Sequence, residues 1–363
     1  METMFDYISK TKNKSVEELP LNEVDIALFC TLSYLPWDYI VSPPKQTNPI
    51  KLVDAINKFN DWNYASTFRI MKDQELLRLL KQSNRYTNIL MSNYVNHYDQ
   101  INQIQFSAVT FSLPNGKSII VFRGTDDTLI GWKEDFNMSF ESPIKAQEEA
   151  TDYLNHIIPF LDDKIIIAGH SKGGNLAVYS SIFIDEQNKD KIEIVYNFDG
   201  PGFLEEITST TNYQEMSNKI QTFIPESSII GMLLEQTETY TIVKSYQIGI
   251  LQHSLYSWII QDNQFIKLKK ITSSSIYINQ TLKEWIKSLS KEEREKVIDS
   301  LYRVFEKTGA STISELTSNW IQNSKTIIEN FHDMDYTTKL FLLNTMVELF
   351  KISKKNLSLY FNK

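Results

Sequence analysis

Residues 169–173, Gly-His-Ser-Lys-Gly, have the spacing of a serine nucleophile held between two glycines. The string alone is weak evidence, so its context decides. An apolar run, 164–168, leads directly into it, and a helix-forming stretch beginning at Gly174 follows. This is the context of a nucleophile elbow, a tight strand-to-helix turn that presents a serine hydroxyl above a sheet. We therefore predict Ser171 as a nucleophile rather than as an ordinary turn residue.

A serine hydroxyl needs a base to accept its proton, and the chain has five histidines. Four of them precede the first predicted sheet strand, lie in helical regions or adjoin the serine itself: His97, His156, His332 and His170. His253 follows a late sheet segment that begins at Tyr240. The chain order nucleophile, acid, histidine accompanies a nucleophile elbow, so we predict His253 as the general base.

The acid that would orient the histidine is less sharply defined. Asp199 lies at the C-terminal end of a predicted strand, 192–198, and this is where a parallel sheet presents its chemistry. An aspartate before Gly200-Pro201-Gly202 could instead cap that turn with its side chain. Glu226 and Ser228 are alternative partners for the histidine. We predict Asp199 as the acid and keep these alternatives open.

An oxyanion formed at the substrate carbonyl needs hydrogen-bond donors. We predict the backbone N–H of Lys172, the residue after the nucleophile, as one donor. Thr125 follows an earlier strand, and its N–H or hydroxyl is the second candidate. Arg123 is predicted to be structural and to pair with Asp135. Chemistry of this kind requires no metal and no cofactor.

The bulk composition limits the classes of partner. The chain has 363 residues and a net charge of −8, which argues against a nucleic-acid partner. Its single cysteine, Cys30, excludes an intramolecular disulfide and a cysteine zinc cluster. The N-terminus lacks the features of a secretion signal, and no apolar run approaches the roughly 18 residues of a membrane span. We expect a cytoplasmic protein without a transmembrane segment, and the sequence leaves its oligomeric state open.

The elements that must position these residues alternate between strands and helices. A Pro-Asn-Gly turn at 114–116 predicts a hairpin, and helices are expected from 144 and from 174. Four strands are predicted around them: 106–112, 118–123, 164–168 and 192–198. This alternation predicts a mainly parallel sheet covered by helices on both faces, as in the α/β-hydrolase fold.

The rest of the chain is predicted to be largely helical. A helix is expected over 22–33, and residues 50–100 carry helical periodicity. We expect residues 1–20 to form a flexible N-terminus and residues 21–280 to form the hydrolase domain. Residues 281–363 are expected to form a helical annex packed on that domain, with a capping box that begins at Ser290.

Several of these segments resemble a known family. Residues 120–125, with Trp132 and Asp135, resemble the first signature of class 3 (fungal-type) lipases, and residues 169–177 look like their elbow. The chain is most similar to a bacterial branch of that superfamily, the Mbeg-like hydrolases, over about residues 20–345. Three further segments carry this resemblance: Asn197 to Phe203, Pro225 to Leu233 and Gln252 to Trp258.

The resemblance implies an α/β-hydrolase fold and lipase- or esterase-like activity. It also implies Ser171 as the nucleophile and His253 as the base. One departure concerns the acid, because class 3 lipases carry it in an Asp-x-Val-Pro segment that falls at Ser228 here. Either the acid has moved to Asp199, or the triad lacks an ordinary carboxylate.

We therefore expect a serine hydrolase that acts on carboxylic esters of a lipid or acyl type. The same residues would serve a thioesterase or an acyltransferase. The alternative from another class is a catalytically silent hydrolase fold used as a binding or scaffold protein, with the annex as its partner surface. The expected partner is a small-molecule ester or lipid substrate, and not a nucleic acid.

Overall fold

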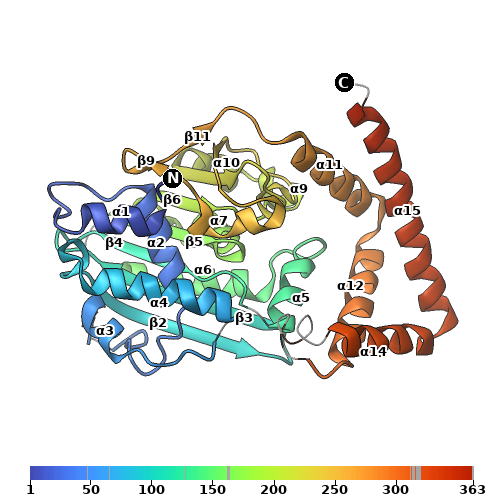
Figure 1. Cartoon of the computed structure of the whole chain (residues 1–363), viewed down its shortest axis with the longest axis horizontal. Helices are drawn as coiled ribbons and strands as arrows, with labels where there is room; N and C mark the ends of the chain where they lie inside the picture. Colours follow the sequence, from blue (N-terminus) through green and yellow to red (C-terminus); the bar gives the residue numbers. More distant parts are fainter. Residues whose placement is uncertain are drawn as a thin grey trace.

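The centre of the molecule is a mixed β-sheet (Figure 1). The computed structural model describes the chain except residues 47, 65, 127, 162–163, 311, 313–314, 316–319 and 362–363. Within the described part, nine strands follow the order β1-β2-β3-β4-β5-β6-β7-β8-β11. Strands β4 to β8 run parallel, whereas β1, β2, β3 and β11 are antiparallel to their neighbours. The strands of this sheet are β1 (Ile50–Lys51), β2 (Leu90–Asp99), β3 (Ile104–Ser112), β4 (Ser118–Phe122), β5 (Ile165–His170), β6 (Ile192–Phe198), β7 (Ile220–Pro225), β8 (Tyr240–Val243) and β11 (Lys267–Leu268).

Helices cover both faces of this sheet. A hairpin of β9 (Ile260–Gln261) and β10 (Gln264–Phe265) stands apart from it. The helices of the first 220 residues are α1 (Met4–Thr11), α2 (Glu23–Leu32), α3 (Leu52–Lys58), α4 (Thr67–Lys81), α5 (Leu129–Asn137), α6 (Lys145–Ile157), α7 (Lys172–Phe183), α8 (Glu186–Lys189), α9 (Glu205–Thr208) and α10 (Thr211–Met216). In the described part of the remaining chain, the helices are α11 (Ser273–Ser288), α12 (Lys291–Glu306), α14 (Trp320–Asp333) and α15 (Tyr336–Phe361).

The alternation of side chains along the strands sends apolar residues to two separate cores. Val109, Phe111 and Val121 belong to the core that α1 to α4 cover. Ala108, Ile120 and Phe122, their neighbours on the same strands, belong to the core beneath α6, α7 and α10. The central strands are therefore buried on both sides, as expected for an α/β sheet enclosed by helices.

The four predicted strands are confirmed as β3 to β6, and the Pro-Asn-Gly turn joins β3 to β4 as an antiparallel hairpin. The longer strands β2 and β7 were not predicted, and neither were the two-residue strands β1, β9, β10 and β11. The region 50–100 was expected to be helical, yet β2 occupies its last ten residues. This strand lies near the sheet edge and is only partly buried, so polar residues interrupt its apolar pattern. His97 therefore lies on β2 and not before the sheet.

The first 20 residues differ from the expected flexible segment. Helix α1 buries Met4, Tyr7 and Ile8 in the core shared with α2. The Tyr7 hydroxyl donates to Asp25, which also receives Arg85 in a fully buried ion pair of 2.7 Å. The spacing of the apolar residues at positions 4, 7 and 8 is that of one helix face, which explains why this short segment is held.

Helices α11, α12, α14 and α15 form an arm along one side of the sheet domain (Figure 1). The arm begins with α11 at Ser273, earlier than the expected position 281. Helix α12 starts after Ser290, which caps it in the predicted capping box with Glu293. Helix α15 packs along α11, where Trp285 Nε1 donates to the carbonyl of Thr345 at 3.0 Å. None of the described helices has a stretch both long and apolar enough to span a membrane.

Candidate active site

Ser171 occupies a sharp turn between β5 and α7, as the sequence predicts. Its backbone has φ 58° and ψ −133°, a conformation that a residue with a side chain adopts only under strain. The turn needs glycine on both sides. A Cβ at Gly169 would lie 2.0 Å from the carbonyl oxygen of Gly173, and one at Gly173 would lie 2.2 Å from that of Phe122. The elbow therefore lifts Ser171 to the C-terminal edge of the sheet.

His253 and Asp199 come together although 54 residues separate them. Asp199 ends β6 and is almost fully buried, and His253 ends a short 3₁₀ turn, Gly249–His253. The distance from His253 Nδ1 to Asp199 Oδ2 is 2.7 Å. Because an ionised carboxylate can only accept, Nδ1 carries the proton and Nε2 of a neutral ring is left as an acceptor. This is the tautomer that a general base needs.

Ser228 also contacts Asp199, so two of the three candidate acids belong to one cluster. Ser228 Oγ donates to Asp199 Oδ1 at 2.5 Å, and the Gly231 N–H donates to the same oxygen at 3.1 Å. Asp199 thus accepts from three donors, and Ser228 supports the carboxylate without touching the histidine. Among the described residues, no hydrogen bond joins Glu226 to His253.

His170, the residue before Ser171, holds the backbone of His253. Its ring centroid lies 4.4 Å from that of His253, and its Nε2 lies 2.7 Å from the His253 carbonyl oxygen. A carbonyl can only accept, so Nε2 carries the proton. Tyr34 OH, 2.8 Å from Nδ1, then donates to the other ring nitrogen. Burial and the neighbouring His253 lower the pKa of His170 well below its usual range, which keeps this ring neutral.

The hydroxyl of Ser171 has no hydrogen-bond partner within the described chain. His253 therefore lies beside the elbow, through its contact with His170, without a hydrogen bond to the serine itself. Hydrogen bonds of this kind are often long in a free enzyme and tighten when substrate binds.

The turn after β4 reaches Ser171 from the other side. A Cβ at Gly124 would lie 3.0 Å from Ser171 Cβ and 2.5 Å from the His170 carbonyl oxygen. The next residue, Thr125, is one of the two predicted oxyanion donors. Its hydroxyl is hydrogen bonded to Asp135. The other predicted donor, the N–H of Lys172, stands at the first position of α7, where the helix supplies no acceptor.

The predicted pairing of Arg123 with Asp135 is wrong. Arg123 instead donates to Asn96 at 3.1 Å and lies 3.5 Å from Asp126. Arg123 is buried directly after the last residue of β4, and its partners lie on β2, beyond the intervening β3, and in its own turn. This leaves Asp135 to the hydroxyl of Thr125.

A buried charge cluster lies beneath the elbow and was not predicted. Lys172 Nζ contacts Glu134 Oε2 at 2.7 Å and both oxygens of Gln105, the carbonyl and Oε1, at 2.8 Å. The other oxygen of Glu134 accepts the N–H of Ala146 at 3.0 Å. One ion pair therefore ties β3, α5, α6 and α7 together below Ser171. A buried ammonium group has three N–H donors, and each of them needs an acceptor. No local sequence pattern around Lys172 indicates which residues supply these acceptors.

Asp135 lies at the edge of this cluster, 3.9 Å from Lys172 Nζ. Its Oδ1 is buried and has no hydrogen bond among the described residues. This burial raises the pKa of Asp135 to about 7, although Lys172 and the Thr125 hydroxyl oppose the rise. The carboxyl therefore titrates close to neutral pH, next to a predicted oxyanion donor.

The remaining histidines lie elsewhere. His97 Nδ1 lies 2.6 Å from Glu149 Oε1, His156 lies beside Phe160 and His332 is exposed near Asp333. A further residue that sequence reasoning missed is Asn175, whose Nδ2 donates to the carbonyls of Pro201 and Gly202 at 3.1 and 3.0 Å. It fixes the turn that follows Asp199.

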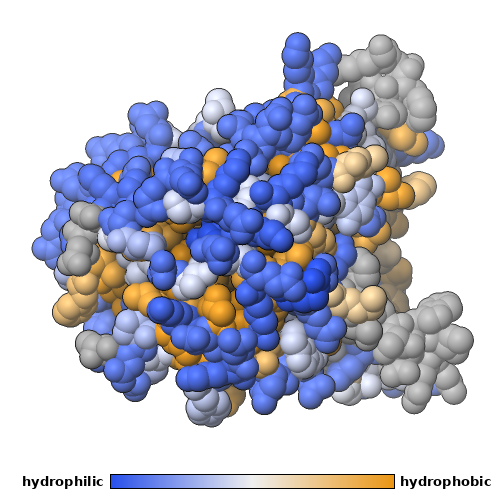
Figure 2. All heavy atoms as spheres, turned by 60° about the vertical axis from the view of Figure 1, so that its left-hand side comes forward, coloured by the Kyte–Doolittle hydropathy of each residue, from blue (hydrophilic) through white to orange (hydrophobic). Residues whose placement is uncertain are grey.

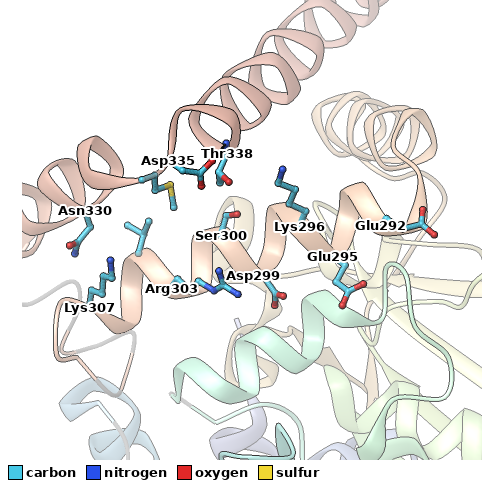
Figure 3. Close-up of a pocket in the computed structure, with 12 residues that line it drawn as sticks. Glu292, Glu295, Lys296, Asp299, Ser300, Arg303, Lys307, Asn330, Asp335 and Thr338 are labelled. Carbon is cyan, nitrogen blue, oxygen red and sulfur yellow. Dashed lines mark hydrogen bonds between the residues drawn. The ribbon is translucent and has the colours of Figure 1, made fainter.

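A pocket of about 410 Å³ lies away from these residues, between α12 and the corner of α14 and α15 (Figure 3). None of the candidate catalytic residues lines it. Its walls carry both signs of charge, with Lys296 and Arg303 beside Asp299 and Asp335. This mixture points to no particular class of ligand.

The parallel sheet, the elbow between β5 and α7, and the positions of Asp199 and His253 after β6 and β8 define the α/β-hydrolase fold. The chain belongs to the Mbeg1-like family, whose sequence model matches residues 80–303, and the expected membership is thereby confirmed.

Two solved structures are similar to the chain. One is M37 lipase, with 13% identity and a TM-score of 0.37 over 58% of this chain and 70% of that one. The other is a triacylglycerol lipase from Penicillium expansum, with 9% identity and a TM-score of 0.30 over 50% of this chain and 74% of that one. No curated protein sequence matches the chain.

Proposed function

We propose that this protein is a serine hydrolase that cleaves carboxylic esters of a lipid or acyl type. One observation carries the proposal: His253 Nδ1 lies 2.7 Å from a buried Asp199, beside an elbow that presents Ser171. The three residues occur in the chain order that accompanies this fold. Asp199 takes the role of the acid, and Ser228 supports it.

In the proposed reaction, Ser171 Oγ bonds to the ester carbonyl carbon, and its proton passes to His253 Nε2. The oxyanion accepts hydrogen bonds from the N–H of Lys172 and from Thr125. The intermediate then collapses, the bond to the alcohol breaks, and His253 returns the proton to the departing oxygen. Water repeats the sequence on the acyl-enzyme and releases the acid.

The surroundings of His253 support an apolar substrate. The turn that precedes it exposes Ile248, Ile250 and Leu251. From residue 239 to residue 261 the sequence contains no acidic residue. The turn is nevertheless anchored, because buried Gln252 accepts the Ser227 N–H at 2.9 Å. Apolar side chains on a fixed turn beside the base suit the acyl part of an ester better than a charged substrate.

The apolar surface extends beyond this turn. Tyr246 OH accepts from Lys72 Nζ at 3.1 Å, which links the turn region to α4, where Met71 is exposed. On the side of the molecule where α1 and α4 lie, apolar side chains gather in a hollow with a hydrophilic rim (Figure 2). An acyl chain is the kind of ligand that such a surface accommodates.

The second candidate function is a catalytically silent fold used for binding. The observation that favours it is the missing hydrogen bond between Ser171 and His253 among the described residues. A thioesterase or an acyltransferase would use the same groups as the ester hydrolase. Acyl thioesters and added alcohols as acceptors, assayed beside esters, separate these reactions.

Labelling with a fluorophosphonate probe tests whether the serine is activated. We expect the full chain to be labelled and to hydrolyse a p-nitrophenyl octanoate faster than the acetate. Ser171→Ala should abolish labelling and lower kcat by on the order of 10⁶, as loss of a triad nucleophile does. Ser181→Ala is the matched control, because this serine lies on the same helix and only donates to Ala177. Absence of labelling in the unmodified chain would favour the silent fold.

A further inference from the structure

Helix α15 has two apolar faces, and the described residues cover only one of them. The inner face lies along α11, where Tyr277 OH is 2.6 Å from Ser353 Oγ and Asn356 Nδ2 donates to Thr281 at 3.3 Å. The outer face exposes Met346 and six further large apolar side chains, each between 41% and 75% exposed. We call these six the α15 stripe: Tyr336, Leu340, Leu343, Val347, Phe350 and Leu357.

The spacing of the α15 stripe indicates the shape of what covers it. Its members follow at intervals of four, three, four and three residues from Tyr336 to Phe350, and Leu357 lies one heptad further on. Lys354 occupies the one heptad position that is not apolar. Alternation of three and four residues is the pattern by which a helix packs against another helix. A lipid surface requires no such register.

The charges at the two ends of the helix are opposite. Lys351 and Lys354 are exposed near its C-terminal end, whereas Asp333 and Asp335 are exposed just before its first residue. Two copies of α15 placed side by side in opposite directions about the midpoint of the stripe bring Lys354 of one within about one turn of Asp335 of the other, whereas Lys351 lies about two turns from it. A parallel pair would instead place like charges together.

We propose that the α15 stripe is the contact between two copies of this chain, paired as antiparallel helices. Met346 and Val347 lie midway along the stripe, so the two-fold axis passes there. Two stripes of six half-exposed side chains supply on the order of 1,000 Å², the area at which specific interfaces begin. The contact is isologous and closes as a dimer.

The oligomeric state of the full chain tests this inference. Light scattering after gel filtration at tens of micromolar should give twice the chain mass. Leu343→Glu combined with Phe350→Glu should give the monomer mass with an unchanged circular dichroism spectrum. Phe160→Glu is the matched control, since Phe160 is 78% exposed and lies outside α15, and it should remain a dimer. Because the candidate catalytic residues lie outside α15, serine labelling should be the same in all three.

Single cysteines test the direction of pairing. The one native cysteine, Cys30, is buried and does not interfere. Val347→Cys should form a disulfide with itself across the axis. Tyr336→Cys and Leu357→Cys should each fail alone and crosslink when mixed. Self-crosslinking of all three would overturn the antiparallel arrangement.

Two results would overturn the dimer itself. One is the monomer mass for the unmodified chain at 100 µM. The other is a monomer that floats with vesicles of phosphatidylcholine and phosphatidylserine and loses this binding in the Leu343→Glu, Phe350→Glu variant. That outcome would assign the α15 stripe to a membrane surface.

Discussion

Replacement of Asp199 by asparagine gives the sharpest test of the proposed triad, because the site fixes how the amide must lie. Asp199 Oδ1 receives the Ser228 hydroxyl and the Gly231 N–H, so the amide oxygen has to remain there. The amide NH₂ then faces His253 Nδ1, which was 2.7 Å from a carboxylate oxygen. Since both groups cannot donate, the imidazole proton moves to Nε2, and the base is lost.

The size of the effect follows from the cost of the alternative arrangement. An amide flipped to restore the productive tautomer would turn NH₂ toward the Gly231 N–H and leave that donor unpaired. A buried unpaired donor costs about 1–3 kcal/mol, and the weaker bond to the imidazolium adds to it. A total near 3 kcal/mol lowers kcat by roughly 10²-fold, and a similar change has cost about 10⁴ in another enzyme.

Steady-state hydrolysis of p-nitrophenyl octanoate and thermal unfolding should be measured together. Asp199 has φ 53°, which asparagine tolerates, so Asp199→Asn should unfold at nearly the same temperature as the unmodified chain. Ser228→Ala is the control, because it removes one donor and leaves the carboxylate, and we expect a loss within about tenfold. A stable Asp199→Asn with kcat within threefold of the unmodified chain would refute the role of Asp199.

Three further changes probe the surroundings. We expect kcat to fall about tenfold per pH unit above pH 7, where Asp135, with a pKa of about 7, becomes ionised. The ionised carboxylate then holds the only proton of the Thr125 hydroxyl, so this hydroxyl cannot donate to the oxyanion. Asp135→Asn should therefore flatten the alkaline limb of a kcat–pH profile. An alkaline limb that persists in Asp135→Asn would contradict this. His170→Ala should stay folded and have a lower kcat with little change in KM, because the variant removes the hydrogen bond that holds the backbone of His253. An unchanged kcat would exclude a positioning role for His170. Lys172→Met should lower the free energy of unfolding, measured by urea titration, by about 3–5 kcal/mol, because it leaves the Glu134 carboxylate buried without its ion-pair partner. Lys117→Met removes one partner of an exposed ion pair and should lower the free energy of unfolding by at most about 1 kcal/mol. Equal losses in the two lysine variants would show that burial does not govern the Lys172 pair.

The parts of the site that could be predicted are those encoded locally. Gly169 to Gly173 combine a buried strand, a tight turn and a helix start within a few residues, so the elbow can be read from the sequence alone. Asp199 could be proposed because it ends a predicted strand. The structure places it against His253, but no local pattern distinguished it from Glu226.

The parts that could not be predicted depend on contacts between distant segments. The Lys172 ammonium finds its acceptors 38 and 67 residues away, on α5 and at the start of β3. Tyr34 reaches His170 across 136 residues. The mistaken pairing of Arg123 with Asp135 has the same origin in part, because Arg123 donates to Asn96, 27 residues away on β2, and no local pattern indicates that contact.

The contact between Ser228 and Asp199 restricts how sequences related to this one can diverge. Oδ1 of Asp199 and Oγ of Ser228 are only 2.5 Å apart, so a chain with aspartate at both positions would bring two carboxyl groups together. Such a pair must share one proton, and the charge on the histidine's partner would then depend on pH. Evolution could move the acid between positions 228 and 199. The intermediate sequence would then more easily have one carboxylate beside a small neutral residue than carboxylates at both positions. In an alignment of relatives, the two positions should covary, with aspartate at one or the other.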